Sequence, residues 1–180
     1  ERVVHSGGSL PVAALTNNTY EDSVASFQRI GKEPRSLHGA GHSLKRFWWA
    51  GTGAKRYQHR SGSAVEHAFE LLNRASVHRS MWSIVYDQNN LRIHFRTHGN
   101  REIRMVRFDA FDFSCATPVK ILDITEDLSE DVSNDFVTYT QQRNRDLIEN
   151  AFAKTLFLPE LSHEQLDTLS EYPDTMMCEK

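Results

Sequence analysis

The sequence lacks the features that would place it directly among metal-binding, membrane or nucleic-acid-binding proteins. It has two cysteines, Cys115 and Cys178, far apart in the chain, which is typical of neither a metal motif nor a disulfide framework. No apolar run approaches the roughly 18–20 residues that a membrane helix needs. The net charge of −3 gives no electrostatic reason to expect a nucleic-acid partner. We therefore expect no metal or other cofactor, no membrane insertion and no bound nucleic acid.

The chain is long enough for one domain. Its 180 residues can bury a sizeable core, and 39% hydrophobic with 25% charged residues is an ordinary globular composition. The chain begins at Glu1 without an initiating Met or a signal peptide, so we interpret it as the interior of a longer protein. Residues 1–180 are predicted to be a single domain or the C-terminal half of one, and the sequence does not determine the compartment.

Hydrophobic periodicity predicts a short buried strand and then two helices in the first third of the chain. The strand covers residues 10–15, an apolar run that ends at a pair of asparagines. Residues 21–30 repeat apolar side chains with helical spacing, and a segment capped by Ser43 does the same. Gly51 and Gly53 weaken the second helix toward its end.

A third helix and an antiparallel meander follow. Ser63 and Glu66 have the spacing of a capping box at the start of the helix. The period then changes to two over residues 82–105, which predicts three strands joined by short turns. The basic face of this meander is interpreted as solvent-exposed, with Arg92, His94, Arg96 and Arg104. The opposite face is predicted to be buried, with Trp82, Ile84, Tyr86, Ile93, Phe95 and Met105.

The remaining segments complete an α+β pattern. Residues 119–124 are interpreted as a short extended piece, and residues 125–135 as an acidic, polar connection. Residues 140–153 form a predicted helix with Leu147, Ile148, Ala151 and Phe152 facing inward. A last short helix begins at Ser162, and the tail at 172–180 is predicted to be frayed. Helices, then a meander, then helices define the α+β class.

Most candidate sites in the sequence have an ordinary structural interpretation. His38 and His42 have helical metal-ligand spacing, but the intervening glycines oppose a helix and no acidic ligand accompanies them. Residues 51–55 (GTGAK) lack the spacing of a phosphate-binding loop. Trp48 and Trp49 are interpreted as packing residues, and Cys115, in an apolar neighbourhood, as a buried structural thiol.

The stretch ALTNNTY at the end of the apolar run has two interpretations. Asparagine forms strands poorly and turns well, so the pair can simply mark a turn before the next helix. Alternatively, one side-chain amide is held at a strand end where a reacting group could meet it. Neighbouring strand residues point to opposite faces, so Asn17 is predicted to face the site and Asn18 to start the turn.

Three stretches resemble, in the same order, segments of the choloylglycine hydrolase and penicillin V acylase family of linear amide C–N hydrolases. MWSIVYDQNNLRIHFRTHGNREIRMVRFDAFDFSCATPVKILDI is similar to that family's Trp-Ser-Val-Val-Tyr-Asp strand, its Phe-Arg-Thr strand and its Phe-Asp-Phe and Pro-Val-Lys-x-Leu-Asp segments. LPVAALTNN resembles its Leu-Thr-Asn segment, and SLKRFWWA its Ser-x-x-Arg-Phe segment. The resemblance covers about residues 10–152.

The resemblance implies the fold and the chemistry of an N-terminal nucleophile hydrolase. The fold is a four-layer αββα sandwich, and the nucleophile is a cysteine whose own α-amine acts as the base. Asn17 matches the asparagine that helps hold the tetrahedral oxyanion. Arg46 matches the arginine beside the nucleophile, where its charge would favour the thiolate. The family has a proline soon after the asparagine, whereas this sequence has Asn18-Thr19-Tyr20.

Residue 1 is Glu, so neither cysteine of this chain can present the free α-amine that this mechanism needs. We therefore expect the nucleophile in a missing N-terminal half of the same protein, and a small-molecule amide as substrate. Substrates of this kind include conjugated bile salts, penicillin V and N-acyl amines. The alternative is a non-catalytic homologue acting as a binding or structural module. Because half of a sandwich leaves an apolar sheet face open, the chain is expected to associate with that missing segment or with itself, or to have that face covered by rearrangement.

Overall fold

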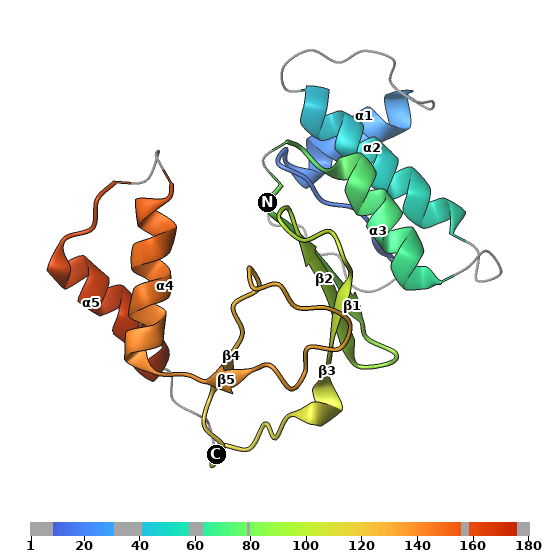
Figure 1. Cartoon of the computed structure of the whole chain (residues 1–180). Helices are drawn as coiled ribbons and strands as arrows, with labels where there is room; N and C mark the ends of the chain where they lie inside the picture. The colour runs from blue at the N-terminus through green and yellow to red at the C-terminus, as the bar shows by residue number, and fades with distance from the viewer. Residues whose placement is uncertain (1–8, 31–40, 58–62, 79, 156–158, 176–180) are drawn as a thin grey trace. The chain divides into compact units, whose positions relative to one another are not determined.

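The computed structural model describes residues 9–30, 41–57, 63–78, 80–155 and 159–175 (Figure 1). The chain divides into two compact units, residues 1–103 and residues 104–180. Both combine helices with short antiparallel strands, so the α+β class predicted from the sequence is confirmed. No helix in the described part of the chain is long and apolar enough to cross a membrane.

The first unit contains three helices and a β-hairpin (Figure 1). The helices are α1 (Tyr20–Ile30), α2 (Gly41–Arg56) and α3 (Ala64–Ala75). The strands are β1 (Trp82–Asp87) and β2 (Arg92–Thr97). All three predicted helices are therefore present, and α2 continues through both of its glycines. The cap predicted at Ser43 is wrong, because α2 begins two residues earlier and Ser43 lies in its first turn.

An aromatic cluster joins α1 to α2. Phe47 of α2 is buried, and the rings of Tyr20 and Phe27 from α1 meet it edge-on at centroid distances of 6.1 and 6.0 Å. Ser23 and Ser26 are the buried residues of α1, where small side chains let the two helices approach. The core of this region therefore consists of aromatic rings packed beside small residues.

The predicted buried strand at residues 10–15 is wrong, because the segment is an irregular loop. Val12 is its one buried residue, whereas Leu15 is 75% exposed. The hydroxyl of Tyr20 donates to the carbonyl of Val12 at 2.8 Å and accepts from its N–H at 3.1 Å. The backbone groups that a strand would use for pairing are therefore satisfied by one side chain of α1.

The glycines inside α2 are sites of close packing. A Cβ atom on Gly51 would lie 2.4 Å from Val12 Cγ1, and one on Gly53 would lie 2.1 Å from Leu71 Cδ2 of α3. Any larger residue would push α2 away from these neighbours. Sequence reasoning treated the two glycines as weakening the helix, whereas in the structure they permit its contacts.

Helix α3 begins where the sequence predicts but without the predicted capping box. Ser63 occupies the N-cap position and makes no side-chain cap hydrogen bond. Phe69 is buried, and its ring lies 4.9 Å from the guanidinium carbon of Arg96 on β2. Arg96 also donates to the Phe69 carbonyl at 3.5 Å and to the side chain of Asn73. Helix α3 therefore packs against the hairpin face that carries Arg96.

The hairpin itself is antiparallel as predicted, with Ile84 opposite Phe95 and Tyr86 opposite Ile93. The burial predicted for this face is wrong at two positions. Trp82 and Tyr86 are 59% and 61% exposed, although Phe95 is buried. The reason is that α3 covers the opposite face of the hairpin, the one that the sequence pattern assigned to solvent.

The second unit opens with β3 (Arg104–Arg107), the third predicted strand, and a 3-10 turn, η2 (Phe108–Ala110). Its strands β4 (Lys120–Ile121) and β5 (Val137–Thr138) pair antiparallel, and Met105 bridges Asp131 in parallel. Strand β5 lies beyond the acidic segment and was not predicted. Arg104 was predicted on the exposed face but is fully buried, and its Nη1 donates to the carbonyls of Ile124 and Glu126.

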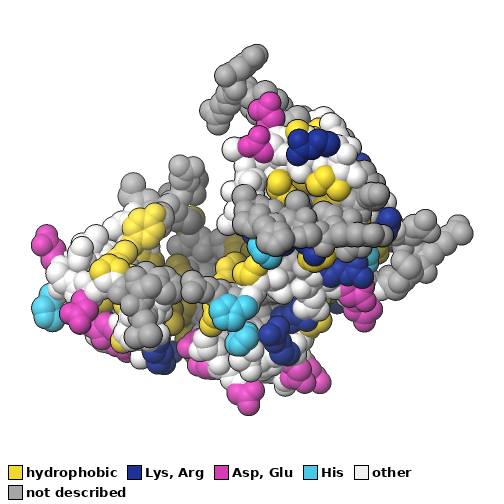
Figure 2. Space-filling model, turned by 90° about the horizontal axis from the view of Figure 1, so that it is seen from above, with side chains coloured by type: hydrophobic (Ala, Val, Ile, Leu, Met, Phe, Trp, Pro, Cys, Tyr) yellow, Lys and Arg dark blue, Asp and Glu magenta, His cyan; other side chains and the backbone are white. Residues whose placement is uncertain are grey.

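Two capped helices and a final turn end the described chain: α4 (Gln141–Ala153), α5 (His163–Glu171) and η3 (Tyr172–Thr175). Thr140 caps α4 through the N–H of Arg143, and Ser162 forms a full capping box with Gln165. The inward face predicted for α4 is partly wrong, because Leu147 is 49% exposed. Figure 2 shows hydrophobic side chains at the surface of this helix pair. Residues 176–180 of the predicted frayed tail lie outside the described residues.

Candidate functional site

Asn17 lies in the loop before α1 and is tied to the first turn of α2. Its backbone N–H donates to Ser43 Oγ at 3.1 Å, and the Ser43 hydroxyl donates in turn to Thr16 Oγ1 at 3.0 Å. Ser43 is buried, so this pair of bonds is shielded from water. The backbone at Asn17 therefore has a fixed position relative to α2.

Arg46, one turn further along α2, contacts the side chain of Asn17 directly. Its Nη2 donates to Asn17 Oδ1 at 2.8 Å. A guanidinium can only donate, so this contact identifies the oxygen of the amide and directs its NH2 group elsewhere. The Nε–H of Arg46 is buried without a hydrogen-bond acceptor among the described residues. The structure thus brings together the two site residues that the sequence predicts.

This arrangement presents an exposed amide NH2 beside a positive charge. Asn17 is solvent-exposed, whereas Arg46 is half-buried. Preorganised N–H donors beside a cation stabilise negative charge that develops on an oxygen atom. The same charge would favour a thiolate placed close to it. The pair is therefore suited to an anionic intermediate.

The role predicted for Asn18 as the start of the turn belongs to Thr19. The Thr19 hydroxyl accepts the N–H of Asp22 at 3.3 Å and donates to the Asp22 carboxylate at 2.6 Å. These reciprocal bonds cap α1 at the residue just before Tyr20. Sequence reasoning concentrated on the asparagine pair and missed the Thr-x-x-Asp spacing that signals this cap.

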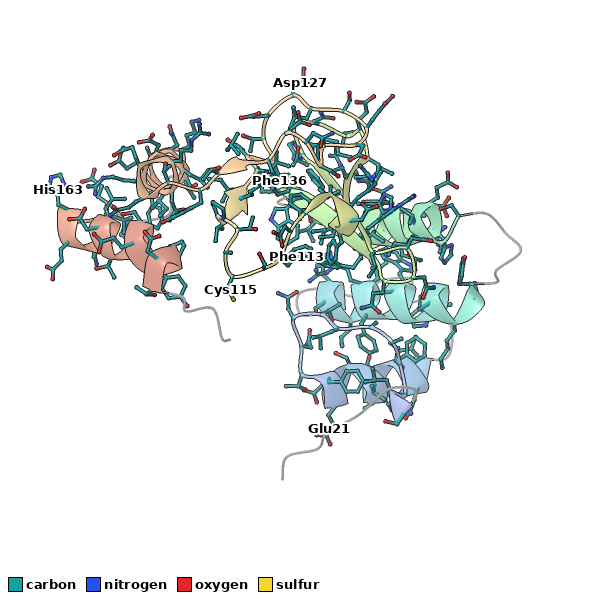
Figure 3. The ribbon with its side chains drawn as sticks, turned by 90° about the horizontal axis from the view of Figure 1, so that it is seen from below. Glu21, Phe113, Cys115, Asp127, Phe136 and His163 are labelled. Atoms are coloured by element: carbon teal, nitrogen blue, oxygen red, sulfur yellow. The ribbon has the colours of Figure 1, made fainter. Side chains whose placement is uncertain are left out.

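Cys115 lies in a different environment from the one predicted. It was predicted to be a buried thiol, but it is exposed on the loop that leads to β4 (Figure 3). Its sulfur is disulfide-bonded. The aromatic residues near it pack among themselves, with Phe111 and Phe136 edge-on at 4.8 Å. The apolar neighbourhood in the sequence thus forms a cluster of rings that does not enclose the sulfur.

The structure adds no support for a metal site at His38 and His42. His42 is exposed at the start of α2, and His38 lies outside the described residues. Within the described ranges, no group of three His, Cys, Asp or Glu side chains could hold a metal ion. Trp49 is half-buried, and Lys45 Nζ lies 4.7 Å from the centre of its ring.

Sequence reasoning also missed a polar cavity of about 210 Å³ in the first unit. It lies where the end of α3 meets the open end of the hairpin, and Asn73, Trp82, Arg96 and Arg101 are among its lining residues. Arg96 was assigned to a solvated face. Phe69 and Asn73 hold Arg96 in place. They are four positions apart, so both lie on one face of α3.

The fold and the Asn17–Arg46 pair define the class to which the chain can be compared: an α+β protein with an amide donor and a cation side by side. No family model and no curated protein sequence matches the chain. Among solved structures, penicillin V acylase from Agrobacterium tumefaciens is similar at a TM-score of 0.52 and 14% identity, over 68% of this chain and 45% of that one. The chain therefore shares a fold-level relation with that acylase and spans less than half of its length.

Proposed function

We propose that this chain is part of an amidohydrolase of the N-terminal nucleophile class and that it supplies the oxyanion-binding side of the active site. In this proposal, a cysteine at the mature N-terminus attacks a linear amide. The Asn17 amide donates to the oxygen that becomes negative, and the amine leaves. Water then attacks the acyl-cysteine and releases the acid. Penicillin V, conjugated bile salts and N-acyl amines are the substrates to be tested.

The observation that carries the proposal is the hydrogen bond from Arg46 Nη2 to Asn17 Oδ1. It turns the NH2 group of Asn17 outward, where a donor to an external oxyanion has to be. The bond also holds the guanidinium of Arg46 against the side chain of Asn17 that carries the donor. The positive charge is then close enough to favour both an attacking thiolate and a developing oxyanion.

The resemblance in the sequence and the structural similarity to penicillin V acylase support the same class. The acylase is more than twice as long as the matched region, so the proposal assigns the nucleophile to sequence of the same protein beyond these 180 residues. The four-layer αββα arrangement is part of this proposal. The second sheet would then cover the hairpin face that carries Tyr86.

The test is amide hydrolysis by the full-length mature protein and by two matched variants. Asn17→Ala removes the donor and is expected to lower kcat by about 10²–10³-fold, as measured for other oxyanion donors. Asn18→Ala changes the neighbouring residue of the same type and is expected to keep kcat. Both variants should melt close to the wild type.

Three results would contradict the proposal. The first is full turnover by Asn17→Ala. The second is loss of turnover in Asn18→Ala instead, which would exchange the roles of the two asparagines. The third is a wild-type protein that hydrolyses none of the three substrate classes, in which case the non-catalytic binding module is the better account.

A further inference from the structure

The polar cavity at the end of α3 lies apart from Asn17 and Arg46, and all its lining residues belong to the first unit. They come from the last turn of α3, the connection from α3 to β1, the start of β1, the end of β2 and the turn after β2. The backbone N–H of His98 donates to the Met81 carbonyl at 2.7 Å and closes the strand ends on each other. The cavity is therefore bounded in part by helix and strand ends, and in part by the connection from α3 to β1 and the turn after β2.

Arg96 is held rigidly at this cavity. Its Nη2 donates to the Asn73 side chain and to the Phe69 carbonyl, and its plane lies over the Phe69 ring. Its Nε–H is buried and has no hydrogen-bond acceptor among the described residues. Buried polar groups in native proteins almost always have a partner, so this unused donor shows that the described residues do not complete the hydrogen bonds of the Arg96 guanidinium.

A second arginine adds positive charge to the same cavity. Arg101 Nη2 lies 3.4 Å from His98 Nδ1, and the remaining donors of this exposed side chain are available. No Asp or Glu is among the described residues that line the cavity. Burial and the charge of Arg101 both lower the pKa of Arg96, as expected for two cations without a neutralising anion.

We propose that this cavity binds the carboxylate or phosphate group of a small molecule. The guanidinium of Arg96 supplies N–H donors, Arg101 supplies a second set, and the exposed indole of Trp82 flanks an attached apolar group. The forked donors of arginine match the paired oxygens of both anions. A cavity of about 210 Å³ fits such a head group with a small ring or chain attached.

The test is calorimetric titration of the protein with benzoate, inorganic phosphate and benzamide, the neutral counterpart of benzoate. Benzoate or phosphate is expected to bind, with affinity falling as salt rises, and benzamide is not. Arg101→Gln and Arg96→Gln are expected to raise Kd at least tenfold. Arg92→Gln, at the far end of β2, is the matched control and is expected to leave Kd unchanged. Arg101 is exposed, so its variant remains informative if Arg96→Gln fails to fold.

Asn17→Ala separates this cavity from the proposed active site. That variant is expected to bind benzoate as the wild type does, whether or not the protein hydrolyses amides. The proposal is overturned if neither anion binds, if benzamide binds as well as benzoate, or if Arg101→Gln keeps the wild-type Kd. It is also overturned if Asn17→Ala loses the bound benzoate while Arg101→Gln retains it.

Discussion

Asn17 and Arg46 are 29 positions apart in the chain and meet through one hydrogen bond of 2.8 Å. Their residue types and positions could be predicted from the resemblance of two short motifs. Their contact could not, because it depends on how the loop before α1 is tied to Ser43 of α2. That tie follows from tertiary packing, which local sequence patterns do not determine.

Among the described carboxylates, Asp131 has the most strongly lowered pKa. It accepts from the Ser133 hydroxyl at 2.5 Å, from the Ser133 N–H at 3.0 Å and from Arg107 Nε at 2.7 Å. These bonds favour the charged form and lower its pKa to about 2, with the Ser133 hydroxyl as the largest cause.

A lowered pKa gives Asp131 a predictable effect on acid stability. The stabilisation is fully present above the ordinary carboxyl pKa of 3.8 and is lost as the pH falls toward about 2. We expect Asp131→Asn to lower Tm at pH 6, with the gap to the wild type closing between pH 4 and pH 2. Asp109, which also contacts Arg107 but is 76% exposed, is the control, and Asp109→Asn should change Tm less. A gap that stays constant with pH would contradict the assignment.

At the scale of elements, the sequence identified helices better than strands. Amphipathic spacing located α1, α2, α3 and α4, and the capping residue Ser162 located α5, because helices are specified locally. The strand at 10–15 failed because Tyr20 satisfies the Val12 backbone, and β5 was missed because two residues give no period. The burial of the hairpin was reversed in part because α3 covers the face of Arg96, which no pattern within β2 reveals.

The glycines of α2 provide a test of element packing. Gly51→Ala would press on Val12, a buried β-branched side chain with little freedom to move. We expect it to lower the free energy of unfolding by about 1–2 kcal/mol, since overpacking outweighs the gain of about 1 kcal/mol in helix propensity. Gly53→Ala meets the end of the more flexible Leu71 and should cost less.

Gly99→Ala is the control for these two variants, because nothing lies within 4 Å of a Cβ atom at that position. Urea unfolding of the three variants measures the order of the effects. If Gly51→Ala were as stable as the wild type, the close approach of α2 to Val12 would be wrong.

For the whole molecule, the exposed aromatic residues on one face of the hairpin bear on assembly. Tyr86 and Trp82 are more than half exposed on a face that also carries the partly buried Ile84 and Ile93 and the buried Phe95. Large exposed apolar side chains gathered on one face favour association. We expect the 180-residue chain alone to form oligomers in sedimentation velocity, and Tyr86→Ser to shift it toward the monomer.

Tyr172→Ser is the matched control for this prediction, since Tyr172 is 58% exposed on η3, outside the hairpin. It should leave the oligomer intact. A wild-type chain that sediments as a monomer at all concentrations would show that the hairpin face does not drive association.

The residue at the mature N-terminus of the full-length protein tests the central proposal most directly. Asn17 and Arg46 can serve amide hydrolysis only if a nucleophile with a free α-amine reaches them. N-terminal sequencing and intact mass of the mature protein measure that residue without any assumption about the substrate. The account predicts cysteine, and a mature protein that begins with anything other than Cys, Ser or Thr would contradict it.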